Sequence, residues 1–265
     1  MISAKTLTLH DGTPVPLTCV GSGPTVVVVH GVMSTGENWL DVAHHLAPIH
    51  QCVLLNRRGR TPGAALGADY GLHTEVGDLR DLLNDLGPDV TLVGHSYGGT
   101  IALLTALEHP GLRSLVLYEP AWPLVGPIGG SAVRLIAETV ARGDLDTALA
   151  AILTQIMNMP AEAVDQLRDA PQWQDQRVLV PSTVAELRAL DALPPTIGRF
   201  ARLATPTRIL LGEATPAESP FSHTARALVD VMPDAVLERV PGQGHLAHVF
   251  APARLAAAIA AAGLA

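Results

Sequence analysis

A serine flanked by glycines is the clearest chemical signal in the sequence. Ser96 lies in the hexapeptide GHSYGG, residues 94–99, directly after an apolar run at residues 90–93 and at the start of a helical pattern. Where a strand turns at once into a helix, the positions two before and two after the turning residue have room only for glycine. The turn strains the backbone of the serine and holds its Oγ above the sheet. These residue types at this spacing predict a nucleophile for acyl transfer rather than an ordinary tight turn.

Strand and helix patterns alternate on both sides of this motif. The predicted strands are short and mostly apolar, with a β-branched run at residues 25–30, and they cover residues 25–30, 51–55, 90–93, 115–118, 207–211 and 236–240. The predicted helices have apolar residues at helical spacing and cover residues 37–47, 74–86, 98–109, 222–232 and 251–262. Such alternation is typical of an α/β fold with a mostly parallel sheet that is covered on both faces.

Residues 121–200 interrupt the alternation. They hold no convincing strand run, and prolines separate four helical patterns at residues 131–142, 145–157, 161–169 and 184–190. We therefore expect one α/β core, built from residues 1–120 and 201–265, with residues 121–200 inserted as a helical cap, or lid. The length of 265 residues thus describes a single catalytic domain with an insertion.

With the serine motif in this setting, the sequence resembles the α/β hydrolase fold family over nearly its whole length. The resemblance implies an eight-stranded, mostly parallel sheet flanked by helices, with a helical cap insertion. His30 and Gly31, which follow the first predicted strand, look like the oxyanion-loop signature of that family. By this likeness the backbone N–H groups of Val32 and Tyr97 would hold the negative oxygen that develops on the substrate. His30 itself is expected to be structural rather than a base.

The general base implied by the resemblance is a histidine after the last strand. His245 directly follows a glycine-rich turn after the strand expected at residues 236–240, and His248 lies three residues further on. We expect His245 to be the base and His248 to be its neighbour or a helix-capping group.

The acid is where the sequence departs from the common pattern of the family. The family usually places an aspartate three residues after the glycine that closes the strand at residues 207–211, and that position is Thr215. Threonine cannot carry the charge that orients the histidine and stabilises the imidazolium. Three carboxylates could substitute for it: Glu119, Glu213 and Glu218.

Glu119 is the preferred acid because it ends the strand at residues 115–118, just before the helical segment. Some members of the family, haloalkane dehalogenases and zearalenone-type lactonases among them, place the acid at that strand end. The segment at residues 214–221 is also similar to that of the lactonase group. Glu213 and Glu218 remain alternatives, and each could instead be a solvated loop charge.

Two further groups of residues were considered as substrate ligands. The arginines of the RRGR segment, residues 57–60, follow a strand where the family often has Asp, Arg and Gly, and the resemblance implies that they are structural and paired with acids. The cap supplies apolar candidates for the substrate pocket. Trp122 is preferred because it lies three residues from Glu119, and the others are Met157, Met159, Trp173, Leu124, Ile128, Ile152 and Ile156. They suggest a small, largely apolar and uncharged substrate.

Composition excludes several classes of partner. The net charge is −8, and Lys5 is the single lysine, so the chain lacks the basic surface of a nucleic-acid binder. No apolar run is long enough to span a membrane, and residues 1–12 do not resemble a secretion signal, so we expect a cytoplasmic protein without a membrane partner. No histidine and cysteine cluster has the spacing of metal ligands, and no cofactor or metal is expected. A homodimer is left open.

These residues predict a serine hydrolase that cleaves an ester-type bond, in a carboxylester or a lactone, through an acyl-enzyme. Ser96 would attack the carbonyl carbon while His245 takes its proton. Epoxide hydrolase and dehalogenase chemistry in this family uses an aspartate where this chain has Ser96. The alternatives are a small-molecule receptor on the same scaffold, and a cofactor-free perhydrolase or lyase with the same residues.

Overall fold

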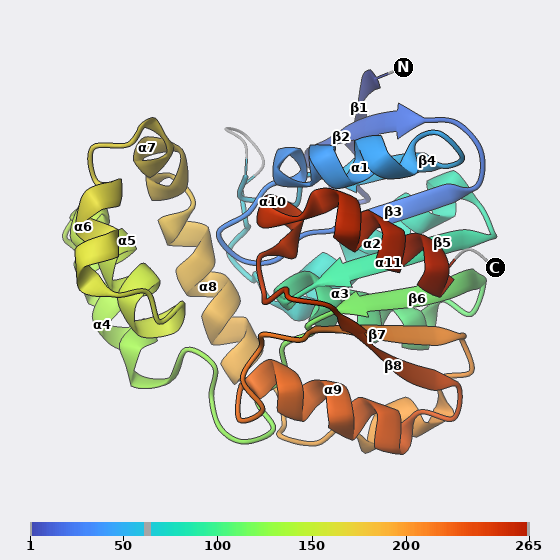
Figure 1. Ribbon diagram of the computed structural model, residues 1–265. Helices are drawn as coiled ribbons and strands as arrows, with labels where there is room; N and C mark the ends of the chain where they lie inside the picture. The colour runs from blue at the N-terminus through green and yellow to red at the C-terminus, as the bar shows by residue number, and fades with distance from the viewer. Residues whose placement is uncertain (1, 61–64, 264–265) are drawn as a thin grey trace.

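A mostly parallel sheet with helices on both faces forms the core of the protein. The computed structural model describes residues 2–60 and 65–263, and within them the sheet has eight strands in the order β1-β2-β4-β3-β5-β6-β7-β8 (Figure 1). The strands are β1 (Ile2–Thr8), β2 (Pro14–Gly21), β3 (Thr25–Val29), β4 (Gln51–Leu55), β5 (Val90–His95), β6 (Leu112–Tyr118), β7 (Thr207–Gly212) and β8 (Ala235–Val240). β2 pairs antiparallel with both β1 and β4, and the other neighbouring pairs, from β4 to β8 in the sheet order, are parallel. The predicted fold class is confirmed.

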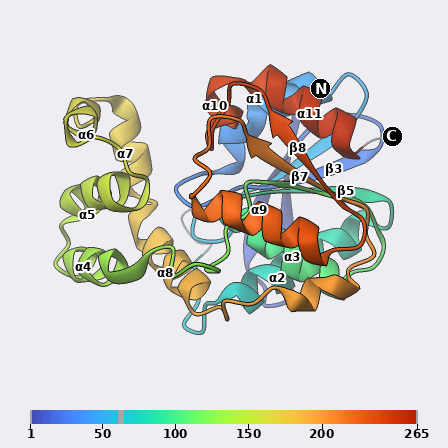
Figure 2. The ribbon, with the colours of Figure 1, turned by 60° about the horizontal axis from the view of Figure 1, so that its bottom comes forward.

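The helices form two layers, one on each face of the sheet (Figure 2). One layer contains η1 (Gly36–Trp39), α1 (Leu40–Leu46), α10 (Ala247–Phe250) and α11 (Pro252–Gly263). The other contains α2 (Leu72–Leu86), α3 (Tyr97–Glu108), η3 (Gly198–Arg202) and α9 (Pro220–Val231).

The sequence of β3 shows why its strand can occupy the centre of the sheet. Successive side chains of a strand point to opposite faces, so a strand covered on both sides must be apolar throughout. Val27 and Val29 belong to the core beneath α2 and α3, whereas Val26 and Val28 belong to the core beneath α1 and α11. Each of these buried valines contributes about 1.5–3 kcal/mol relative to an exposed one.

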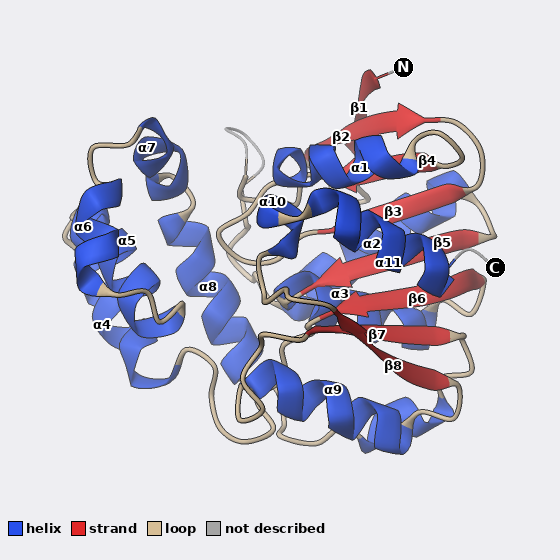
Figure 3. Cartoon of the chain, viewed as in Figure 1, coloured by secondary structure: helices blue, strands red, loops and turns tan. Residues whose placement is uncertain are grey.

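Between β6 and β7 the chain leaves the sheet and forms a group of helices. They are α4 (Gly130–Ala141), α5 (Leu145–Ala151) with its π-helical continuation η2 (Ile152–Ile156), α6 (Ala161–Leu167), α7 (Pro171–Arg177) and α8 (Val180–Asp191). We call residues 130–191 the helical insert. It lies beside the carboxyl ends of the parallel strands and has a core of its own, with α8 nearest the sheet (Figure 3).

Two prolines of the insert mark the places where helices begin. Pro171 and Pro181 stand in the first turns of α7 and α8, so they separate helices as the sequence pattern indicated. Proline fits there because the first N–H groups of a helix have no partner within it. The structure therefore contains an additional helix, α7, and α8 begins four residues before the predicted pattern at residues 184–190.

One side chain joins the two ends of the insert. The carboxylate of Asp191, the last residue of α8, accepts hydrogen bonds from the backbone N–H groups of Ile128, Gly129 and Gly130 at 2.6–3.1 Å. These groups precede or begin α4, where free N–H groups favour an anion.

Within residues 2–60 and 65–263, no helix is both long and apolar enough to cross a membrane.

Candidate active site

Ser96 occupies a strained turn at the carboxyl end of β5. It stands between β5 and α3 with φ 54° and ψ −121°, a conformation that costs a residue with a Cβ atom of order 1–3 kcal/mol. A Cβ atom on Gly94 would come within 2.7 Å of the Gly98 carbonyl oxygen, and one on Gly98 would overlap the carbonyl oxygen of Val29. Glycine at both positions therefore allows the turn that the sequence predicted.

His245 and Glu119 lie in contact although they are 126 positions apart in the sequence. His245 follows β8, and its Nδ1 lies 2.7 Å from Oε2 of Glu119. The Glu119 side chain is fully buried and His245 is 25% exposed. Because a carboxylate can only accept, Nδ1 carries the proton and Nε2 keeps a free lone pair. That tautomer is the one a general base requires.

The second oxygen of Glu119 is held from the neighbouring strand. Oε1 accepts hydrogen bonds from Gly212 N at 2.8 Å and from the hydroxyl of Thr215. Thr215 stands where the family usually has its acid, and here its hydroxyl contacts the Glu119 carboxylate. The backbone of Glu119 has φ 47°, a second strained residue at the carboxyl edge of the sheet.

The other two carboxylates have different partners. Glu213 is exposed and accepts a hydrogen bond from Gly242 N at 2.8 Å. The Glu218 side chain is 88% exposed and lies 3.4 Å from His223. Of the three candidates, the geometry places Glu119 against His245.

Three residues that the sequence analysis did not single out fix the loop of His245. His95 Nε2 lies 3.0 Å from the His245 carbonyl oxygen, so His95 donates through Nε2. The Tyr118 hydroxyl donates to the Gly244 carbonyl and accepts from Ala247 N. The Phe221 ring stacks on the His245 ring with centroids 4.0 Å apart. His95 stands within the serine motif, which was the available signal for it.

The neighbouring histidines are neutral. Burial, together with the charge of His245, lowers the pKa of His95 well below its usual value. The same two causes lower the pKa of His248 to about 4. His248 stacks flat on Trp39 with ring centroids 5.0 Å apart, which makes it a packed neighbour of the site. Near neutral pH neither histidine places a positive charge behind the His245 loop.

The loop after β3 comes directly against the serine. A Cβ atom on Gly31 would lie 3.0 Å from the Cβ of Ser96. Val32 follows in this loop, and Tyr97 is the first residue of α3, where N–H groups have no partner within the helix. His30 is fully buried with Nδ1 2.9 Å from the Gly31 carbonyl, and burial lowers its pKa well below the usual value. It is structural, as expected.

The structure contradicts the expectation that Trp122 and Trp173 line the substrate pocket. Trp122 has no exposed surface; it packs edge-on against Phe200 and donates its N–H to the Pro194 carbonyl. Trp173 is buried in the core of the insert and donates to Asp146 at 2.7 Å. A large ring whose N–H is satisfied stabilises packing, and here it leaves no surface for a ligand. Met157 and Met159 are half-buried beside the core of the insert.

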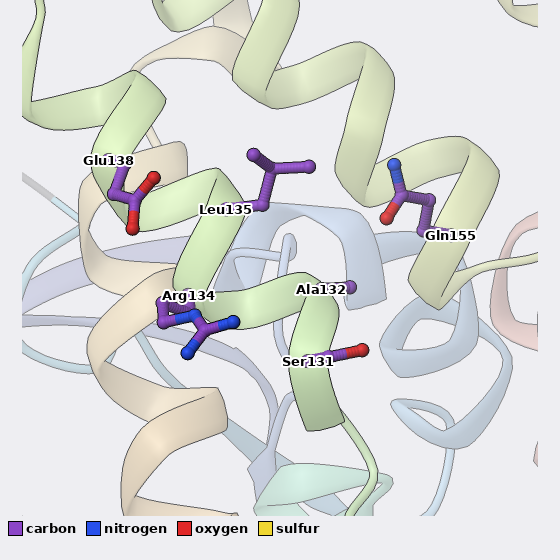
Figure 4. Close-up of a pocket in the computed structure, with 6 residues that line it drawn as sticks. All are labelled: Ser131, Ala132, Arg134, Leu135, Glu138 and Gln155. Atoms are coloured by element: carbon purple, nitrogen blue, oxygen red, sulfur yellow. The ribbon is translucent and has the colours of Figure 1, made fainter.

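A pocket of about 410 Å³ opens elsewhere, on the insert (Figure 4). It lies between α4 and η2 and is lined by Ser131, Ala132, Arg134, Leu135, Glu138 and Gln155. Its lining includes none of the residues around Ser96 and His245. Within residues 2–60 and 65–263, no group of three histidine, cysteine or acidic side chains is placed to hold a metal ion.

Comparison with known proteins agrees with the fold. The sequence model described as "Alpha/beta hydrolase family" matches residues 26–258. The structure of an α/β hydrolase from Sphaerobacter thermophilus is 28% identical with a TM-score of 0.81, and the match covers 96% of this chain and 98% of that one. An esterase from Exiguobacterium antarcticum shares the fold at 19% identity and a TM-score of 0.77, over 97% and 98% of the two chains.

A curated relative gives a shorter match. The lipase LipV of Mycobacterium tuberculosis is 38% identical over 124 residues, which are 45% of this chain and 44% of the lipase. The chain therefore spans less than half the length of that relative.

Proposed function

The chain belongs to the α/β hydrolase family, and on that premise we propose that it is a serine hydrolase of carboxylesters or lactones. The observation that carries the proposal is the contact of His245 Nδ1 with the buried Glu119 carboxylate at 2.7 Å. It leaves Nε2 of the histidine free at the edge of the sheet where the strained Ser96 lies. A serine nucleophile with such a base is the arrangement of acyl transfer.

The reaction proceeds in two steps on this proposal. His245 Nε2 takes the Ser96 proton as Oγ bonds to the carbonyl carbon, and the N–H groups of Val32 and Tyr97 hold the oxyanion. His245 then gives the proton to the leaving oxygen, and the acyl-enzyme forms. In the second step His245 removes a proton from water, the hydroxide displaces Ser96 from the acyl group, and the proton returns to Oγ.

The substrate class is the finer part of the proposal. The helical insert acts as the lid, and its half-buried Met157 and Met159 suggest a small, largely apolar acyl group or lactone ring. An esterase and a lipase are among the similar proteins, which supports a substrate with an ester-type bond.

Activity and covalent labelling test the proposal together. Wild-type protein is assayed with p-nitrophenyl esters of increasing chain length, lactones and thioesters, and is treated with a fluorophosphonate before peptide mass mapping. We expect hydrolysis, an adduct on Ser96, and a loss of kcat of about 10⁴-fold or more in Ser96→Ala. Ser131→Ala, a serine substitution in the pocket of Figure 4, is the matched control and keeps the wild-type rate.

Two outcomes contradict the proposal in different ways. No adduct and no hydrolysis would favour a receptor-type binding protein. An adduct on Ser96 without turnover of any ester, lactone or thioester would keep the nucleophile and point to a lyase or perhydrolase.

A further inference from the structure

Two buried arginines hold the loop beside Ser96 from its two ends. We call residues 30–34 the oxyanion loop. Arg57 donates to the carbonyl of His30 at 3.1 Å through Nε and to that of Gly31 at 3.0 Å through Nη2. Arg60 donates to the carbonyl of Ser34 at 2.9 Å through Nε. The backbone of this loop, which carries the Val32 N–H, is therefore fixed by two guanidinium groups.

Both arginines share one carboxylate from the insert. Oε1 of Glu186, on α8, lies 2.9 Å from Nη1 of Arg57 and 2.6 Å from Nη2 of Arg60. Glu75 of α2 completes the cluster at 2.5 Å from Arg57. The four side chains are between 0% and 2% exposed, and their formal charges sum to zero. A buried charge is tolerated only when it is paired, so loss of any partner disturbs the others.

Further contacts of α8 reach the same loop. The Ser182 hydroxyl accepts from Arg60 at 2.9 Å, and the Thr183 hydroxyl lies 3.1 Å from the sulfur of Met33 within the loop. Glu186 lies four residues after Ser182 and three after Thr183, so its side chain neighbours both of theirs on the surface of α8. Of the insert helices, α8 lies nearest the sheet (Figure 1).

We propose that Glu186 is a positioning residue for the oxyanion hole, through which the insert sets the place of the Val32 N–H by way of Arg57 and Arg60. This inference rests on the proposed serine hydrolase function. The insert then does more than cover the substrate, because the donor to the developing oxyanion depends on its docking. Donor position matters because an oxyanion hole stabilises only a charge that develops within hydrogen-bond distance of it.

The test compares Glu186→Gln with Asp78→Asn. The first change removes the charge shared by the two arginines. The second removes the carboxylate that binds Arg58 at 2.6 Å in the same arginine segment, and the contacts of Arg58 are Asp78, Asp11 and Leu66 rather than the oxyanion loop. Both variants lose a buried ion-pair partner, and only the first disturbs the oxyanion loop.

We expect the loss of the shared carboxylate charge to lower kcat and to leave KM nearly unchanged. Glu186→Gln lowers kcat by about 10- to 100-fold with KM within about threefold of wild type. The same substitution is expected to weaken the binding of the inhibitor phenylboronic acid by a similar factor. The boron atom of this inhibitor takes Oγ of Ser96 as its fourth ligand and places an oxygen in the oxyanion hole. Asp78→Asn loses thermal stability but keeps kcat and the inhibitor affinity.

Several outcomes are decisive. A folded Glu186→Gln protein with wild-type kcat and boronic acid affinity overturns the inference. Equal losses of kcat in both variants overturn it as well, since they show general destabilisation. If Glu186→Gln does not fold, Glu186→Asp, which keeps the charge on a shorter side chain, is expected to show a smaller loss of the same kind, and wild-type kinetics in that variant overturn the inference. Absence of a fluorophosphonate adduct in the wild-type protein would instead reject the proposed function.

Discussion

At the scale of single residues, the division of labour between Glu119 and Thr215 is the main feature of the site. Glu119 presents one oxygen to His245 and the other to Gly212 N and Thr215. All of its contacts are donors, as a buried carboxylate requires. Thr215 therefore hydrogen-bonds the carboxylate that we propose as the acid, and this contact explains why a threonine stands at the position where the family usually has its acid.

Replacement of Glu119 by glutamine tests this arrangement. An amide can present its NH₂ group to His245 and stabilise the wrong tautomer, and it offers no charge to the imidazolium. We expect Glu119→Gln to lower kcat by on the order of 10³–10⁴-fold with an unchanged fluorophosphonate target. Steady-state kinetics on the best ester of the panel measure the loss.

The control is Glu213→Gln, which alters an exposed carboxylate on the neighbouring loop and is expected to keep kcat within twofold, roughly. Full activity in Glu119→Gln together with a large loss in Glu213→Gln would reverse the assignment of the acid.

At the scale of helices and strands, the elements that could be predicted from the sequence are those with a recognisable pattern of apolar residues. The central strands β3 to β7 contain apolar runs, and they were expected close to their observed places. The edge strand β8 contains Glu238 and Arg239, and it was expected from the alternation of strands and helices. The edge strand β1 is almost wholly exposed and has no such pattern, and it forms by pairing with β2. Pairing of that kind depends on backbone hydrogen bonds, which a local pattern does not reveal.

The same reasoning explains the site. Ser96 and His245 could be proposed because each follows a strand at a glycine-bearing turn, and Glu119 because it ends a strand where some members of the family place their acid. Tyr118, Phe221 and Glu186 act through contacts with residues more than 20 positions away, and their own segments have no distinguishing signal. Trp122 shows the converse error, because nearness to Glu119 in sequence did not place its ring at the surface.

Two glycine substitutions test how the helices are built. Gly77 lies inside α2, and a Cβ atom there would make an ordinary contact at 3.6 Å with His10. Gly77→Ala is expected to raise the free energy of unfolding by about 0.8 kcal/mol because alanine is the better helix former. Gly98→Ala, which forces a Cβ atom into the carbonyl of Val29, is expected to lower it by about 3 kcal/mol.

Urea unfolding of the two variants beside wild type gives both values. A stabilised Gly98→Ala protein would show that the turn at Ser96 relaxes easily, against the close packing described above.

At the scale of the whole molecule, folding excludes protons from a group of buried histidines. Burial lowers the pKa values of His30 and His95 well below their usual range and that of His248 to about 4. Between pH 6.5 and pH 4 the unfolded chain binds protons at these positions while the folded protein does not. Stability therefore falls as pH falls through this window, and it is fully present above it.

Substitution of His248 isolates one part of this effect. His248→Phe keeps a ring on Trp39 and removes one titrating group, so the loss of stability between pH 6.5 and pH 4 is expected to be less steep by up to about 1.4 kcal/mol per pH unit. Urea unfolding at several pH values measures the slope, with pH 8 as the common reference. An identical slope in the two proteins would contradict the lowered pKa of His248.

The contact of Asp191 with residues 128–130 has a consequence for how such a protein can change over time. Because one carboxylate binds the backbone at residues 128–130, the two ends of the insert lie side by side. Recombination at these two neighbouring ends could therefore replace the insert by a different group of helices without changing the course of any strand. A transplanted group of helices would bring its own pocket to Ser96, and it would also need an acid that meets Arg57 and Arg60.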